Sequence, residues 1–367
     1  MVQLTSDHLL QGPRGRRLCW EFVDQLTFDL NGRSGLFPMR HSTPGGTVTL
    51  EETAAYCDNQ IAVVRERLSV ENIDDDLLVA LLRNVVGSAR YWQPPDEIDQ
   101  WLMEREVAEV FRPVATAIAS HPLTTWWVSD IARNSQHCIV HTPTESIDYD
   151  SVQALSDWAA CIRTDTERWI GPDTTGLWWT GPLGPHLAAT TRVHPGWGIV
   201  GLSLMEDAPD LQALASVPLS IEREARVHEV HSTDDWRVLV NLAPLDVTRA
   251  RGNDWSRATG LNRQWLVPNW EKISSTIDGV HLSLGGYLAL AGVPIEINPG
   301  VTSLIAGWNP DETYWLTGLA SAHGPITTWS WDEIFHPSRT AGRWVRQAAE
   351  QLGDSTAPHS SGGDWSG

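Results

Sequence analysis

The stretch Tyr91-Trp92-Gln93-Pro94-Pro95 divides the sequence into two parts with different apolar patterns. Proline fixes its own φ angle and disfavours helix at the residue before it, so paired prolines end a helical segment. Before this stretch, apolar residues recur every three or four positions, as in amphipathic helices. Beyond residue 120, short apolar runs bounded by turn residues predict strands among the helices. The sequence therefore predicts an α+β fold, with a helical N-terminal part packed on a mixed-sheet C-terminal part.

The same patterns predict individual elements. On the N-terminal side, helices are expected over residues 54–68, 73–86 and 96–111, after which Pro113 opens a further helical turn. On the C-terminal side, helices are expected over residues 151–169, 234–242 and 340–352. Strands are expected over residues 137–141, 176–180, 197–204, 220–231, 280–284 and 302–306.

Three segments follow from this division. Residues 1–120 are expected to form a mainly helical, acidic N-terminal region, and residues 121–353 a Trp-rich α+β domain. Residues 354–367 are small and polar, which predicts a disordered tail.

Charge and cysteine usage restrict the partners and the compartment. The chain has 26 basic and 46 acidic residues, a net charge of −20, so phosphate backbones and anionic lipid surfaces are poor partners. Residues 51–110 hold 14 acidic residues and 5 Arg, a net of −9. The four cysteines form no CxxC pair, and no apolar leader or membrane-spanning run is recognisable. We therefore expect a soluble, cytoplasmic protein that binds neither nucleic acid nor membrane, in an oligomeric state that the sequence leaves open.

Tryptophan is the most unusual feature of the composition, with 20 Trp against 5 Phe and 5 Tyr. Burial in the core is the simplest role for most of them, because each indole removes about 150–250 Å² from water. Trp178, Trp179 and Trp308 stand in loops rich in glycine and proline, a setting that suits the rim of a pocket. They are the expected substrate-binding residues.

Two short segments contain candidate catalytic residues. In the first, Asp278, His281 and Ser283 bring a carboxylate, an imidazole and a hydroxyl together, and His281 is the leading acid–base candidate, with Asp278 as its partner. In the second, His231 ends an expected strand, where side chains reach the edge of a sheet. His228 and His231 are three apart, so on a strand they face opposite sides and do not predict a metal site. We expect no metal.

These features favour an enzyme that acts on a small planar or aromatic molecule, through a Trp-lined pocket and histidine acid–base chemistry. No Walker, GxGxxG or GxSxG motif is present, and no organic cofactor is expected. The alternative is a non-catalytic protein that binds a protein partner through its acidic helical face. An enzyme requires a pocket in which a histidine and these Trp residues converge, whereas a binding protein requires exposed Trp beside the acidic helices.

Overall fold

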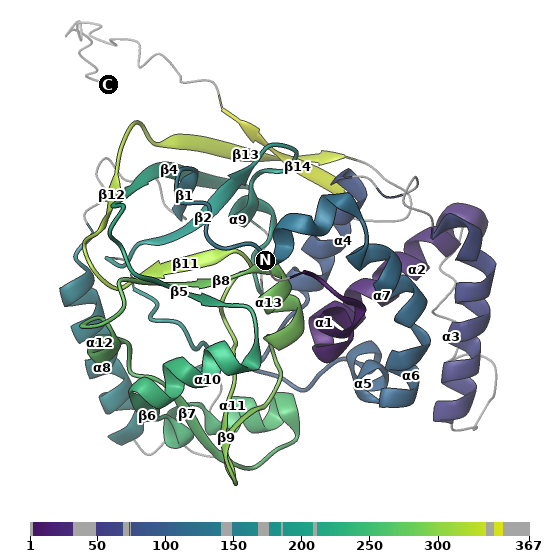
Figure 1. Cartoon of the computed structure of the whole chain (residues 1–367), viewed down its shortest axis with the longest axis horizontal. Helices are drawn as coiled ribbons and strands as arrows, with labels where there is room; N and C mark the ends of the chain where they lie inside the picture. The colour runs from purple at the N-terminus through teal and green to yellow at the C-terminus, as the bar shows by residue number, and fades with distance from the viewer. Residues whose placement is uncertain are drawn as a thin grey trace, which may run out of the picture.

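The computed structural model describes residues 3–31, 49–68, 73, 75–140, 149–167, 176–184, 186–207, 211–334 and 341–347. It has an α+β fold, in which the helices α1 to α7 gather on one side and the strands on the other (Figure 1). The two parts meet along the short helices α1 and α13, which pack against each other. The predicted fold class is therefore confirmed. Residues 354–367, the expected tail, lie outside the described residues.

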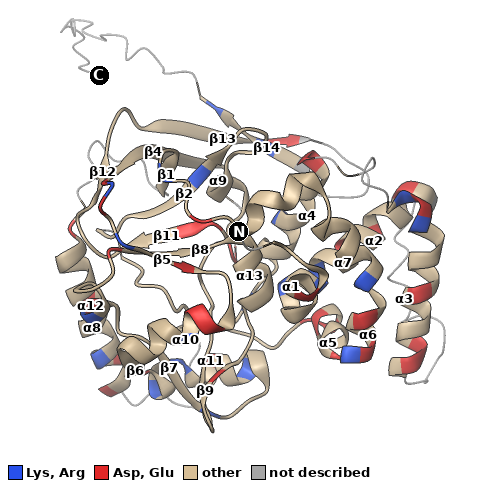
Figure 2. Cartoon of the chain, viewed as in Figure 1, with Lys and Arg blue, Asp and Glu red and all other residues tan. Residues whose placement is uncertain are grey.

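The N-terminal part is built from amphipathic helices with recognisable caps. Thr49 and Glu52 form a capping box at the start of α3, and Asp96 caps α5. The expected single helix over residues 96–111 is two helices, because Glu104 adopts an extended conformation between them. Acidic residues, coloured red, are prominent on α3, α5 and α6 (Figure 2). The helices are α1 (Ser6–Gln11), α2 (Pro13–Asn31), α3 (Leu50–Val64), η2 (Arg65–Arg67), α4 (Asp75–Gly87), α5 (Glu97–Met103), α6 (Arg105–Val110), α7 (Arg112–Ala119) and η4 (Pro122–Val128).

The larger sheet of the C-terminal part has the order β14-β13-β4-β1-β2-β11-β8-β5, with β12 beside β4 and β3 beside β2. Neighbours along this path are antiparallel except β5 and β8, which run parallel at one edge. Its strands are β1 (Gln136–Val140), β2 (Ala189–His194), β3 (Gly198–Ile199), β4 (Ala213–Ile221), β5 (Val227–Val230), β8 (Gly279–Leu282), β11 (Glu312–Trp315), β12 (Ala320–Ala322), β13 (Thr327–Ile334) and β14 (Ala341–Arg346).

A smaller sheet and six further helices complete the fold. The sheet has the order β6-β7-β10-β9, from β6 (Pro244–Asp246), β7 (Gln264–Pro268), β9 (Ile295–Asn298) and β10 (Val301–Ser303). The helices are α8 (Ser151–Glu167), α9 (Val200–Ser203), α10 (Thr233–Leu242), α11 (Thr248–Thr259), α12 (Trp270–Ile273) and α13 (Leu284–Leu290). Among the residues that the structure describes, no helix has the length and apolar composition needed to cross a membrane.

Several predicted C-terminal elements are wrong. The expected helix over residues 340–352 is in part the strand β14, where Trp344 lies opposite Trp331 with ring centroids 5.5 Å apart. Such cross-strand aromatic pairing is invisible to local periodicity. The expected strand over residues 220–231 is two strands, and residues 197–204 form the short β3 followed by α9. Residues 176–180 form no strand.

Tryptophan supplies much of the core. Eight Trp side chains are almost fully buried, and they interlock edge to face in groups such as Trp236, Trp270 and Trp308. The other five are Trp20, Trp127, Trp255, Trp265 and Trp315. Tilted aromatic contacts of this kind add stabilisation beyond the buried area. For these residues, the core role is the one that the structure supports.

Candidate active site

Polar side chains gather at the carboxyl ends of the parallel strands β5 and β8. His231 follows β5 directly, and Ser283 follows β8. Each strand leads into a helix, with Ser232 capping α10 and Ser283 capping α13. Side chains at the carboxyl ends of neighbouring parallel strands share one edge of a sheet, where α/β proteins commonly place their ligands. His231 and Ser283 are therefore close although 52 positions separate them.

His231 lies between a buried hydroxyl and an exposed carboxylate. Its Nδ1 is 2.9 Å from the Oγ of Ser283, and its Nε2 is 3.1 Å from Oδ1 of Asp130. Ser283 is fully buried, whereas the side chain of Asp130 is 77% exposed and that of His231 is 11% exposed. The Nε2 side of the imidazole therefore faces the surface, and the Nδ1 side faces the core.

Glu229 is the residue that links His231 to the interior. Residues two apart on a strand share a face, so Glu229 lies on the same face as His231. Its carboxylate contacts the Nδ1 of His281 at 2.5 Å and accepts a hydrogen bond from the main-chain N–H of Ile131 at 3.1 Å. The two-residue step from Glu229 to His231 is the sequence pattern that places both side chains on one face, whereas the three-residue step from His228 to His231 does not.

His281 is fully buried between two carboxylates. Its Nε2 lies 3.2 Å from Oδ1 of Asp311, opposite the contact with Glu229. Burial lowers the pKa of His281, but the hydrogen bonds to Asp311 and Glu229 outweigh burial and raise that pKa to about 9. At neutral pH the ring is therefore an imidazolium, and each of its N–H groups donates a hydrogen bond to a carboxylate. His281, the leading catalytic prediction, has neither a free lone pair nor access to a substrate.

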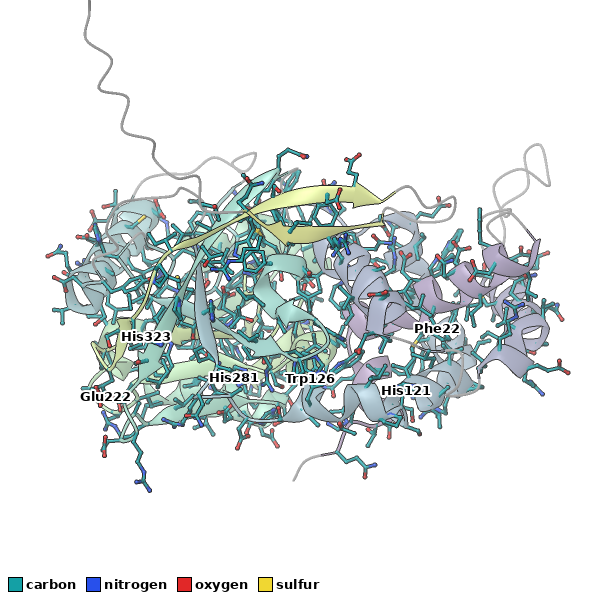
Figure 3. All side chains as sticks on the ribbon, turned by 90° about the horizontal axis from the view of Figure 1, so that it is seen from above. Phe22, His121, Trp126, Glu222, His281 and His323 are labelled. Carbon is teal, nitrogen blue, oxygen red and sulfur yellow. The ribbon has the colours of Figure 1, made fainter. Side chains whose placement is uncertain are left out.

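Arg192 extends this buried network to the segment that bears Asp130. Its Nε donates to Asp311 at 2.6 Å, and its terminal nitrogens donate to the Oγ of Ser129 at 2.8 Å and to the main-chain oxygen of Asp130 at 3.1 Å. The guanidinium also lies 4.9 Å from the ring centroid of Trp126. Figure 3 labels His281 within the sheet part and Trp126 nearer the helices. The network therefore fixes the segment Ser129–Asp130, whose Asp130 side chain contacts His231.

Asp278 is placed away from this site. It precedes β8, at the end of the strand opposite Ser283, which is roughly 16 Å away at about 3.3 Å per residue. There it accepts hydrogen bonds from the Arg226 guanidinium at 2.8 and 3.0 Å, and this ion pair lowers the pKa of Asp278. The structure therefore gives His281 the partners Glu229 and Asp311 in place of Asp278.

The three expected substrate-binding tryptophans lie in one region, because Trp178 and Trp179 contact Gly307, the residue before Trp308. Trp308 is buried against Trp236 and Trp270, and its Nε1 donates to the main-chain oxygen of Glu312. Trp178 and Trp179 are half-buried and pack on Gly307, where a Cβ atom would lie 2.5 Å from that of Trp179. Among the described residues, none of these three tryptophans hydrogen-bonds to His231 or stacks on it.

One group of side chains has the geometry of a cation site. One ligand atom each from Asp130, Glu229 and His231 lies within 4.8 Å of the others. Two carboxylates and an imidazole suit a divalent ion such as Zn²⁺ or Mn²⁺. His228 takes no part, because its Nε2 contacts the main-chain oxygen of Asp235 at 3.0 Å.

Comparison of the chain with protein-family models, curated proteins and solved structures found no match.

Proposed function

We propose that this chain is a cytoplasmic enzyme that acts on a small molecule, with His231 as its acid–base group. The observation that carries the proposal is the arrangement of Asp130, His231 and Ser283 at the carboxyl ends of β5 and β8. A histidine that exchanges protons with a substrate needs one nitrogen held by the protein and the other open to the substrate. In His231, Nδ1 is held by Ser283 and Nε2 contacts only the exposed carboxylate of Asp130, which a substrate can displace, whereas both nitrogens of His281 are held in the core.

Ser283 acts in this proposal as a positioning residue. Its Oγ accepts a hydrogen bond from the main-chain N–H of Gly286 at 3.0 Å and contacts Nδ1 of His231 at 2.9 Å. Because Ser283 is fully buried, a substrate cannot approach its oxygen for nucleophilic attack. The hydroxyl instead holds the imidazole ring with Nε2 directed towards the surface.

Asp130 completes the centre from the exposed side. Its main chain is held by Arg192 and its neighbour Ile131 by Glu229, while its carboxylate stays largely in solvent. A carboxylate that remains close to the ring after the substrate has displaced it from Nε2 stabilises the imidazolium that forms when His231 accepts a proton. Because the carboxylate is exposed, a substrate can take its place beside Nε2.

The test is a turnover screen with p-nitrophenyl acetate, butyrate and phosphate as probes. His231→Gln should lower kcat/KM at least about 100-fold, because positioned acid–base groups contribute about that much or more. His323→Gln is the matched control, since His323 is an exposed histidine just beyond β12. Turnover that is equal in His231→Gln and the parent chain, or absent from the parent chain, would count against the proposal.

A second candidate function is metal-assisted hydrolysis at the same place. The specific observation is the convergence of Asp130, Glu229 and His231, which could bind one divalent ion that acts as a Lewis acid. His231 would then be a ligand and not a base. Two features of its surroundings suit such a ligand set, because the Nδ1 of His231 and the carboxylate of Glu229 are each held by neighbouring polar groups.

Chelation separates the two candidates. Metal assistance predicts that dialysis against EDTA abolishes turnover and that Zn²⁺ or Mn²⁺ restores it. It also predicts that Asp130→Asn and Glu229→Gln each weaken Zn²⁺ binding in a calorimetric titration. Acid–base chemistry at His231 predicts turnover that ignores EDTA.

A further inference from the structure

A cavity of about 400 Å³ lies where the helical part meets the sheet part. Its volume is within the range of small-molecule sites, which often form between domains. Part of its wall is the stretch that divides the sequence, through Tyr91, Gln93, Pro94 and Pro95. The facing wall includes Ala258 at the end of α11 and Val293 after α13. Both parts of the chain therefore contribute to it.

The two carboxylates in the cavity wall are already paired. Asp99 is ion-paired with Arg14, and Arg17 lies 3.3 Å from its other oxygen. Asp96 accepts from the guanidinium of Arg17 at 2.9 Å and from the main-chain N–H of Asp99 at 2.8 Å. Neither carboxylate is left to repel an anion.

The remaining cations in the wall are less fully neutralised. The Nε of Arg16 donates to the main-chain oxygen of Leu10 at 2.6 Å, and its terminal nitrogens donate to those of Leu102, Met103 and Gln11 at 2.8, 3.4 and 3.3 Å. These hydrogen-bond partners are uncharged, and in the described part of the chain one N–H of the guanidinium is left for a ligand. Arg90 contacts Asp207 through Nε at 3.3 Å, and its side chain is 50% exposed. Within the described residues, no hydrogen bond is recorded for the terminal nitrogens of Arg90. They are available to a ligand.

The rest of the wall is largely apolar. The ring of Tyr91 and the rings of Pro94 and Pro95 offer flat surfaces, and Val293 and Met103 add aliphatic ones. Apolar walls with a few polar groups are typical of small-molecule sites. A flat apolar ligand would fit these surfaces, and an anionic group on it would meet Arg16 and Arg90.

We propose that this cavity binds a small anionic molecule with a planar apolar body, such as an aromatic carboxylate. The anionic group is held by Arg90 and Arg16, and the body packs on Tyr91 and the two prolines. A carboxylate with a guanidinium forms a charge-assisted hydrogen bond, stronger than a neutral one. Three Arg and two Asp line the cavity, so its wall carries one more positive than negative charge, although the net charge of the chain is −20.

The cavity is distinct from the site at His231. The helix α13 has Ser283 as its N-cap, and Gly292 and Val293 of the cavity wall follow its other end. Seven helical residues span about 10 Å, so the two sites lie at opposite ends of α13. Ligand binding in this cavity can therefore be tested independently of the proposed acid–base chemistry at His231.

The test is calorimetric titration of the full chain with 1-naphthoate and with its neutral amide, 1-naphthamide. The acid should bind at least about tenfold more tightly, since a charge-assisted contact contributes about 1.5–3 kcal/mol. Arg90→Gln should weaken binding of the acid about tenfold and leave the amide unchanged. Arg263→Gln is the matched control, because Arg263 is exposed and lies outside the cavity wall.

A second variant tests the location. Ala258→Trp places a large side chain in the cavity wall and should abolish binding of 1-naphthoate, with circular dichroism confirming that the variant is folded. Equal affinity for acid and amide, no detectable binding of either, or full binding in folded Ala258→Trp would each overturn the proposal. If Ala258→Trp does not fold, the Arg90→Gln result decides.

Discussion

His281 lies on β8 and His231 directly follows the paired strand β5, yet their surroundings differ completely. His281 is buried with a carboxylate at each nitrogen, whereas His231 has a buried hydroxyl at one nitrogen and an exposed carboxylate at the other. The first arrangement fixes a proton in the core. The second leaves one nitrogen where a substrate could reach it. A histidine beside an acid therefore indicates a catalytic role only when the burial of its ring nitrogens is known.

The contacts of His281 are expected to stabilise the fold, whereas those of His231 are expected to matter for activity. Arg192, Asp311, His281 and Glu229 form a chain of alternating charge in which each cation lies between or beside carboxylates. Removing one member leaves a buried charge without its partner, which costs several kcal/mol. The contacts of His231 include an exposed acid, so changes there should affect stability less. The predictions below test this difference.

The largest effect is expected from Asp311→Asn. Asp311 has φ of 58°, a left-handed conformation that asparagine tolerates, so the backbone should be preserved. The variant removes the charge that pairs with both Arg192 and His281. We expect the free energy of unfolding to fall by about 3–5 kcal/mol in urea titrations. The control is Asp332→Asn, which breaks the exposed pair with Arg343 and should change stability by less than about 1 kcal/mol. Equal effects of the two changes would contradict a stabilising buried network.

The pH dependence of stability should show the proton held by His281. Its pKa is raised from 6.5 to about 9, so its contribution is complete below pH 6.5 and is lost as the pH rises to about 9. Above pH 6.5 the unfolded chain releases this proton while the folded chain retains it. The free energy of unfolding should therefore fall by about 2 kcal/mol between pH 6.5 and 8.

Glu206 and Glu312 act in the same direction within this pH range and must be removed first. Burial raises the pKa of Glu206 to about 8 and that of Glu312 to about 7, so their contributions are also lost as the pH rises. In the double variant Glu206→Gln and Glu312→Gln, the decrease in the free energy of unfolding between pH 6.5 and 8 should come chiefly from His281. A flat stability profile in that background would show that His281 holds no extra proton.

The smallest effect on stability is expected from Ser283→Ala. It removes the N-cap of α13, which typically costs about 1 kcal/mol, and Ser232→Ala removes the N-cap of α10 at a similar cost. The two variants should therefore have similar melting temperatures. Only Ser283→Ala should also lower kcat/KM in the ester screen, because it frees the Nδ1 of His231. If both variants or neither lose turnover, Ser283 does not position the imidazole.

Local signals in the sequence predicted the parts of this molecule that depend on near neighbours. The recurrence of apolar residues every three or four positions indicated α3 and α10, which overlap the expected helices over residues 54–68 and 234–242. The prolines of the dividing stretch marked the change from helices to mixed structure. Local signals could not predict the site, because Asp130, Arg192 and Asp311 lie far from His231 and His281 in the chain.

By itself, the sequence determined an α+β fold, an acidic helical part and a core rich in tryptophan. These properties follow from composition and short-range periodicity, which need no knowledge of distant contacts. Only the tertiary structure decided which histidine has a ring nitrogen facing the surface, which acids accompany it and that residues 341–346 pair as a strand with β13. Those outcomes depend on strand register and burial, and both are set by residues that meet only when the chain folds.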